Sequence, residues 1–163
     1  MKRILFITLL FLFGCSPTEP EDVSYYDLYC SEGYVELWVN YYDIETTTDL
    51  NIDDIQGMIP PHIECLENLT SLDLSDNQLT GEIPSSIGNL TNLTELRLHD
   101  NNLTGQIPPS LGSLTNLGGL YLYNNQLTGE IPPEVCDLIE SNDLWNFEYE
   151  IFQGNYNLIN TCE

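Results

Sequence analysis

The sequence predicts an α/β-type repeat solenoid, a short curved stack of coils with a parallel β-sheet on its concave side. The first observation is a pattern that starts at Leu69, Leu93 and Leu117, each copy 24 residues after the last. The second is the alternation of leucines within each copy, which is typical of a strand. The third is the Gly and Pro that close each copy. A fixed period of this length indicates a solenoid.

Each copy is expected to form one coil. Its Leu-x-x-Leu-x-Leu stretch supplies a short strand whose leucines point inward while alternate residues point outward. The Asn that follows, at positions 77, 101 and 125, can bond backbone groups in its own and an adjacent coil. Leu-Thr-Gly-x-Ile-Pro then uses Gly for an unusual backbone conformation and Pro for a fixed φ. The next stretch predicts loops and short 3₁₀ turns on the convex side.

A fourth, degenerate coil precedes the three clear ones. Subtracting 24 maps Leu74 onto Leu50 and Gly81 onto Gly57. On this alignment Asp53 takes the place of the repeat Asn. A worn terminal repeat is expected beside a cap. The predicted coils are therefore 45–68, 69–92, 93–116 and 117–140.

Non-repetitive segments at 23–44 and 141–163 are expected to cap the stack, because an open end would expose apolar core and an unpaired strand edge. In the first cap, the alternation of Val35, Leu37 and Val39 predicts a short strand that covers the first coil. In the second cap, alternating apolar residues predict a final aromatic strand: Trp145, Phe147, Tyr149 and Ile151.

Four cysteines follow Cys15, an even number that suggests two disulfides in an exported chain, with three possible connectivities. We predict Cys30–Cys65 and Cys136–Cys162, because each bond would tie a cap to the nearest coil. No Cys-x-x-Cys spacing occurs and the two histidines lie far apart in sequence, so neither a metal site nor a cofactor is expected.

Residues 1–14 are typical of a secretory signal peptide, with Lys2 and Arg3 before an apolar run too short to span a membrane. The stretch ending in Gly14-Cys15 resembles the lipobox of bacterial lipoproteins, in which the cysteine receives the lipid. We therefore expect lipid attachment at Cys15 and a polar tether over 15–22. The alternative is an ordinary signal peptide that contains a cysteine.

The chain is strongly acidic, with a formal net charge of −23. Removal of residues 1–14 would leave Arg97 as the only Lys or Arg residue against 26 acidic residues. Such a surface repels nucleic acid and anionic membranes and favours a soluble monomer. It would also attract cations or a basic partner, and composition alone does not separate this reading from general solubility.

Residues 45 to 138 resemble the plant-type class of leucine-rich repeats. The resemblance rests on the Leu-Thr-Gly-x-Ile-Pro signature, the 24-residue period and the sequence Ile-Gly-Asn-Leu-Thr-Asn of residues 87–92. Together with Cys15, the segments 35–38 and 42–47 look like those of bacterial surface lipoproteins that carry this repeat class. The resemblance implies binding of a protein or glycan on the concave face, at the bacterial cell envelope or surface, rather than catalysis.

The outward columns of the concave sheet are where we expect function. The 24-residue period gives a middle column of Asp49, Asp73, Arg97 and Tyr121, beside a second column of Asn51, Ser75, His99 and Tyr123. Arg and Tyr are typical anchors of binding surfaces. The candidate ligand-binding residues are Asp73, Asp76, Glu95, Arg97, His99, Asp100, Tyr121 and Tyr123.

Simpler interpretations of these residues remain open. Arg97 can form a local ion pair with Asp73 or Glu95, of little energetic value when exposed. Stacked carboxylates such as Asp76 and Asp100 can bind calcium, but an acidic composition explains them equally well.

No nucleophile elbow, phosphate-binding loop or metalloprotease motif occurs, so an enzyme is not expected. A triad of Ser75, His99 and Asp100 would lie on a flat open sheet without an oxyanion hole. The leading hypothesis is a membrane-anchored recognition module that binds a protein or glycan. The alternative is a structural or shielding acidic surface lipoprotein with no specific partner.

Overall fold

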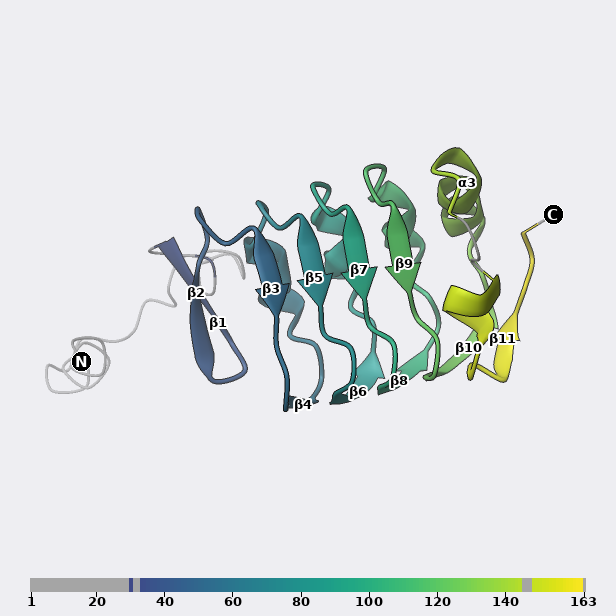
Figure 1. Cartoon of the computed structure of the whole chain (residues 1–163), viewed down its shortest axis with the longest axis horizontal. Coiled ribbons are helices and arrows are strands. Elements are labelled where there is room, and N and C mark those ends of the chain that lie inside the picture. The colour runs from purple at the N-terminus through teal and green to yellow at the C-terminus, as the bar shows by residue number, and fades with distance from the viewer. Residues whose placement is uncertain (1–29, 31–32, 145–147, 163) are drawn as a thin grey trace, which may run out of the picture.

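A computed structural model describes residues 30, 33–144 and 148–162, and in it the coils stack side by side into a short curved solenoid (Figure 1). Each coil contributes one strand to a parallel sheet in the order β3 (Asp49–Asn51), β5 (Ser71–Asp73), β7 (Glu95–Arg97) and β9 (Gly119–Tyr121). The predicted fold class, a small repeat solenoid with a parallel sheet, is confirmed.

A second parallel sheet, which the sequence did not predict, runs along another edge of the coils. Its strands are, in spatial order, β11 (Asn157–Ile159), β10 (Gln126–Glu130), β8 (Asn102–Gly105), β6 (Gln78–Glu82) and β4 (Gln56–Gly57). The glycine of each coil lies in this sheet with φ between 78° and 90°: Gly57, Gly81, Gly105 and Gly129. Residues with a Cβ rarely adopt this conformation, which explains the repeated glycine.

The convex side carries the predicted 3₁₀ turns in three coils, namely η2 (Pro61–Cys65), η3 (Ser85–Asn89) and η4 (Pro109–Ser113). The fourth coil departs from the prediction and forms an α-helix, α3 (Pro133–Ser141). Its buried residues Val135, Cys136, Leu138 and Ile139 follow helical spacing. Cys136 also stands where the earlier coils have Gly88 and Gly112, so this turn is built differently.

The core is a column of leucines that adds one layer per coil. Leu72, Leu96 and Leu120 pair in register across β5, β7 and β9 and are at most 1% exposed. Burial of one such side chain contributes about 1.5–3 kcal/mol. A single coil buries its leucines only against its neighbours, so stability depends on the whole stack.

The repeat asparagines form a buried ladder between coils, as predicted. Asn101 accepts a hydrogen bond from the backbone N–H of Leu79 at 3.0 Å and donates to the carbonyl of Leu74 at 2.8 Å. Asn77 and Asn125 make the same two kinds of bond to their own preceding coils. The ladder therefore satisfies backbone groups where the chain leaves each strand.

The degenerate first coil is two residues shorter than the 24-residue alignment assumed. Leu50 pairs with Leu72 rather than with Leu74, and Asn51 pairs with Asp73. The glycines keep the period of 24, because Gly57 has the backbone conformation of Gly81. The coil has therefore lost the two positions of the repeat Asn and its successor, and the assignment of Asp53 to that Asn is wrong.

The N-terminal cap is a hairpin of β1 (Tyr34–Leu37) and β2 (Asn40–Asp43), which lies at the end of the stack beside β3 (Figure 1). Val35 and Leu37 are fully buried, so the predicted strand is confirmed that far. Val39 is 83% exposed because it lies in the turn after Trp38, whose φ is 53°. The alternation therefore ends two residues earlier than predicted.

The C-terminal cap differs from the predicted aromatic strand. Residues 148–152 form one π-helical turn, η5 (Glu148–Phe152), and Trp145 and Phe147 lie outside the described residues. Ile151 is fully buried, and the backbone carbonyl of Glu150 accepts from the N–H of Leu122 at 2.7 Å. This segment therefore continues the stack through hydrogen bonds to the last coil without forming a strand there.

Both predicted disulfides are present. Cys30 bonds to Cys65 with a Cα–Cα distance of 5.3 Å, and Cys136 bonds to Cys162 at 5.2 Å. Cys65 ends η2 and Cys136 lies in α3, so each bond joins a cap to the convex side of the nearest coil. The predicted signal peptide, the lipid-attachment residue Cys15 and the tether all lie outside the described residues.

Candidate functional site

The outward residues of the first sheet form columns whose members the strand register sets. The middle column is Asn51, Asp73, Arg97 and Tyr121, and the column at its edge is Asp49, Ser71, Glu95 and Gly119. Asp49 therefore leaves the predicted middle column, and Asn51 replaces it, because the first coil is two residues shorter. The predicted neighbours in the three clear coils are correct.

Arg97 lies at the centre of this face and takes Glu95 as its ion-pair partner. Its guanidinium donates to the Glu95 carboxylate at 2.7 Å and lies 5.1 Å from the ring centroid of Tyr121. The hydrogen bond that Arg97 donates to Glu95 raises the pKa of Arg97 further above its ordinary value, and the negative charges of Glu95 and Asp73 add smaller effects. Both partners are partly exposed, so the pair stabilises the fold by about 0–1 kcal/mol.

His99 is clamped between aromatic rings. The Tyr123 ring stacks on it with centroids 4.3 Å apart and planes 10° from parallel. Tyr121 meets it edge-on at 6.3 Å. Only 9% of His99 remains exposed, which is unusual for a polar residue on a sheet face. The four predicted anchors, Arg97, His99, Tyr121 and Tyr123, therefore form one continuous cluster.

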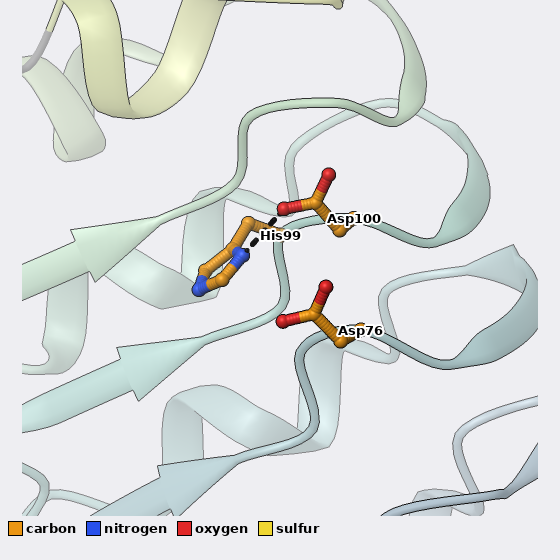
Figure 2. Close-up of side chains that lie close together, drawn as sticks. All are labelled: Asp76, His99 and Asp100. Atoms are coloured by element: carbon orange, nitrogen blue, oxygen red, sulfur yellow. Dashed lines mark hydrogen bonds and ion pairs between the residues drawn. The ribbon is translucent and has the colours of Figure 1, made fainter.

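Asp76 and Asp100 lie beside His99, in the turns that follow β5 and β7 (Figure 2). Their φ values are 54° and 55°, the left-handed conformation that Asp and Asn tolerate best among residues with a Cβ. The same turn position is taken by Asp54 in the first coil and by Asn124 in the last, with φ of 60° and 51°. Backbone geometry thus selects Asp or Asn throughout this column.

The three side chains converge on one point. Nδ1 of His99 lies 2.9 Å from Oδ2 of Asp100, and one ligand atom each from Asp76, His99 and Asp100 falls within 4.8 Å of the others. Figure 2 shows both carboxylates on the same side of the imidazole. Asn124 was missed by the sequence analysis as a site residue. Its amide donates to Oδ1 of Asp100 at 2.8 Å and orients that carboxylate.

Asp73 and Ser75 form a separate pair. The hydroxyl of Ser75 donates to Oδ1 of Asp73 at 2.6 Å, and so does the Ser75 backbone N–H at 3.1 Å. Ser75 therefore donates its hydroxyl hydrogen to Asp73 and not to His99, which would have to accept it in a Ser-His-Asp triad. This arrangement does not activate the serine as a nucleophile.

The repeats match a known family. Residues 67–111 match the family described as leucine-rich repeats in two copies, and residues 116–138 match the leucine-rich repeat itself. No curated protein is similar enough in sequence to count as a match. Within the part of the chain that the structure describes, no helix has the length and apolar character needed to cross a membrane.

Solved structures extend the comparison. One is the complex of BIR3 with SERK2 from Arabidopsis thaliana, at 36% identity and a TM-score of 0.59, over 69% of this chain and 56% of that chain. A second is the ectodomain of the plant membrane receptor kinase GASSHO1/SCHENGEN3 from Arabidopsis thaliana in complex with CASPARIAN STRIP INTEGRITY FACTOR 2. It shares 41% identity and a TM-score of 0.54, over 56% of this chain and 11% of that chain.

A third similar structure is a leucine-rich-repeat protein of Leptospira interrogans, at 35% identity and a TM-score of 0.50, over 58% of this chain and 24% of that chain. The chain therefore spans just over half of the BIR3–SERK2 match and a smaller share of the other two. Proteins with this repeat occur in these comparisons both as plant receptor ectodomains and in a bacterium.

Proposed function

We propose that this chain, which is a leucine-rich-repeat protein with repeats of the plant type, is a recognition module that binds a protein or glycan on its concave sheet. The observation that carries the proposal is the cluster of Arg97, His99, Tyr121 and Tyr123 on the open face of β7 and β9 and the turns after them. We call these four residues the anchor cluster.

The chemistry of the anchor cluster suits binding. Tyr and Arg are enriched among the residues that contribute most to binding energy, because they combine apolar area with hydrogen-bonding groups. Stacking on His99 and the contact with Arg97 fix both tyrosine rings before any partner arrives. Preorganised side chains lose less conformational entropy on binding, which favours affinity.

The similar structures point the same way. Two of them are complexes, one of BIR3 with SERK2 and one of a receptor kinase ectodomain with CASPARIAN STRIP INTEGRITY FACTOR 2. They support recognition of a protein partner by this repeat class. The choice of the concave face, and of a glycan as the other possible ligand, rests on the partly exposed tyrosines of the anchor cluster.

We further propose that the module is exported and held at a bacterial cell envelope by a lipid on Cys15. Two disulfides and the likeness to receptor ectodomains support export, since disulfides persist in oxidising compartments. The lipid rests on the resemblance of Gly14-Cys15 to a lipobox. Growth with a labelled fatty acid tests it: label should enter the wild type and be absent from Cys15→Ser.

The binding proposal is tested by comparing two double variants of the full-length chain. Tyr121→Ala/Tyr123→Ala removes both tyrosines of the anchor cluster, which are partly exposed. Tyr34→Ala/Tyr156→Ala removes two tyrosines that are 53% and 94% exposed in the caps, with the same change of composition. Wild type and both variants are immobilised beside a blank surface, and saturable binding of envelope proteins is measured by surface plasmon resonance. Glycan binding is screened separately by applying each of the three proteins to a glycan array.

We expect a partner that the wild type and the cap variant bind alike, and that the anchor-cluster variant binds at least tenfold more weakly. Equal affinity of all three proteins would reject the concave site. A surface that binds nothing saturably would instead favour the structural or shielding role, in which the acidic surface acts without a specific partner. Circular dichroism of each variant establishes that the fold is intact.

We also propose that the module is not an enzyme. The support is local: Ser75 donates to Asp73, and the carboxylate of Asp100 faces His99 on an open sheet. A screen of the purified chain against generic esters and glycosides tests the statement, and turnover abolished by His99→Gln would overturn it.

A further inference from the structure

We propose that Asp76, His99 and Asp100 form a binding site for a single divalent transition-metal ion of the Zn²⁺ type. This inference goes beyond the recognition function and does not depend on it. The two aspartates follow different strands of the concave sheet, and the histidine precedes Asp100 in the same turn (Figure 2). Stacking of coils therefore brings Asp76 to two adjacent ligands that lie 23 and 24 residues further along the sequence.

The distances fit one ion. Zinc binds His nitrogen and Asp oxygen at about 2.0–2.2 Å, so two ligands of a tetrahedral shell lie about 3.3–3.6 Å apart. The three ligand atoms already lie within 4.8 Å of one another. Asp76 is exposed, so its side chain can rotate and move the carboxylate by about 1 Å, which closes the difference.

An acidic composition accounts for Asp76 and Asp100, but it does not account for the histidine between their carboxylates and the aromatic rings. The left-handed turn selects Asp or Asn at positions 76 and 100, but it places no such demand on the residue before, which is Ser75 in one coil and Tyr123 in another. His99 is nine-tenths buried, and Tyr123 holds its ring with Nδ1 turned toward the carboxylates. A buried imidazole fixed in this direction presents a ligand lone pair when it is deprotonated.

The negative charge of Asp76 and Asp100 also favours binding of a cation. Asn124 satisfies one oxygen of Asp100, and Nδ1 of His99 faces the other. Among the described residues, no Arg side chain pairs with Asp76, and Arg97 is held by Glu95. Two carboxylates therefore face a single imidazole, and a divalent ion bound between them would balance both negative charges.

The donor set selects the class of metal. Imidazole nitrogen favours Zn²⁺, Cu²⁺ and Ni²⁺, whereas Ca²⁺ prefers a shell of six to eight oxygens. Three protein ligands leave at least one coordination position of a Zn²⁺ ion open to solvent on the concave face. The site therefore resembles an open metal centre rather than a closed structural one.

The test is titration of the full-length chain with Zn²⁺ by calorimetry, in a Cys15→Ser background so that no free thiol contributes. The chain without further change should bind one Zn²⁺ ion. Asp76→Asn and His99→Gln should each weaken binding at least tenfold. The matched control is Asp54→Asn, which removes a carboxylate from the equivalent turn of the first coil, where Asp53 replaces the histidine. Its affinity should equal that of the parent.

A second measurement reports the ligands directly. Co²⁺ in place of Zn²⁺ should give a visible absorption band that Zn²⁺ displaces and that His99→Gln abolishes. Asp76 lies on the surface and takes no part in the stack of His99 on Tyr123. The fold of Asp76→Asn should therefore be intact, so that a loss of Zn²⁺ affinity reports the missing ligand. Absence of Zn²⁺ binding would overturn the proposal. Equal losses in Asp54→Asn and Asp76→Asn, or Ca²⁺ competing as well as Co²⁺, would overturn it too, since both indicate attraction to acidic surface alone.

Discussion

The side-chain oxygen of Asn155 accepts the backbone N–H of Leu127 at 3.0 Å, the same bond that Asn125 makes with Leu103 one coil earlier. Asn155 also donates to the carbonyls of Leu122 and Ile151, and it is only 2% exposed. The C-terminal cap therefore continues the asparagine ladder by one more step, although its sequence no longer follows the repeat.

Replacement of Asn155 should loosen this cap. Asn155→Ala removes the partner of the buried Leu127 N–H and a donor to the Ile151 carbonyl, at about 1–3 kcal/mol for each group that water cannot reach. The Leu122 carbonyl keeps a second donor, the amide of Asn125. We expect the free energy of unfolding to fall by about 2–4 kcal/mol in urea denaturation. Asn157→Ala, an exposed change in β11, is the control and should cost less than about 0.5 kcal/mol. Equal losses in the two variants would argue against the ladder.

The convex turns pack too closely for a side chain at Gly112. A Cβ there would lie 2.5 Å from the backbone carbonyl oxygen of Glu134, in the first turn of α3. Because backbone cannot move aside cheaply, Gly112→Ala should destabilise the chain by about 1–3 kcal/mol. Gly118→Ala is the matched control, since its Cβ would be 3.7 Å from the carbonyl oxygen of Thr94. Thermal melts of the two variants should differ by several degrees.

The sequence predicted most of the fold because each 24-residue period corresponds to one coil of the solenoid. It places leucine, asparagine and glycine wherever the coil needs an inward side chain, a backbone partner or a positive φ. It failed in the first coil because the two missing residues include the Asn that would have marked the register, which moved Asp49 and Asn51 to different columns. It also failed in the C-terminal cap, where Tyr149 and Ile151, predicted to lie on a strand, belong to a π-helical turn.

The candidate site was predictable in outline only. The period correctly grouped Arg97, His99, Tyr121 and Tyr123, because it sorts residues by column and coil. It could not say that Arg97 bonds to Glu95 rather than Asp73, since several rotamers reach either carboxylate. Nor did it predict that His99 and Asp76 could bind one metal ion, because the distance between their side chains depends on how the coils stack.

The disulfide of the C-terminal cap should contribute strongly to stability. Cys136 and Cys162 are separated by 26 residues, and closing a loop of this size stabilises a fold by about 3–4 kcal/mol. We expect Cys136→Ser/Cys162→Ser to lower the free energy of unfolding by about that amount. It should also expose amides of β11 to hydrogen exchange before those of β5. Simultaneous exchange in both strands would mean that the cap and the stack unfold as one unit.

Glu150 links stability to pH in an unusual direction. Burial raises the pKa of this carboxyl above its ordinary value. The folded state therefore holds the proton more tightly than the unfolded state, so the stability contributed by Glu150 falls as pH rises through its folded pKa. Where the carboxylate is charged, its partial burial therefore makes the folded state less stable. Glu150→Gln removes that charge and should raise the melting temperature at pH 7.

The gain from Glu150→Gln should shrink as the pH is lowered below the ordinary range of a glutamate, where the wild-type carboxyl is protonated in both states. Melting curves of the two proteins between pH 3 and pH 8, followed by circular dichroism, measure this difference directly. Glu130→Gln, which neutralises an exposed carboxylate at the end of β10, controls for the change in net charge. A gain independent of pH, or one matched by Glu130→Gln, would mean that relief of general acidic repulsion, rather than burial of Glu150, is the cause.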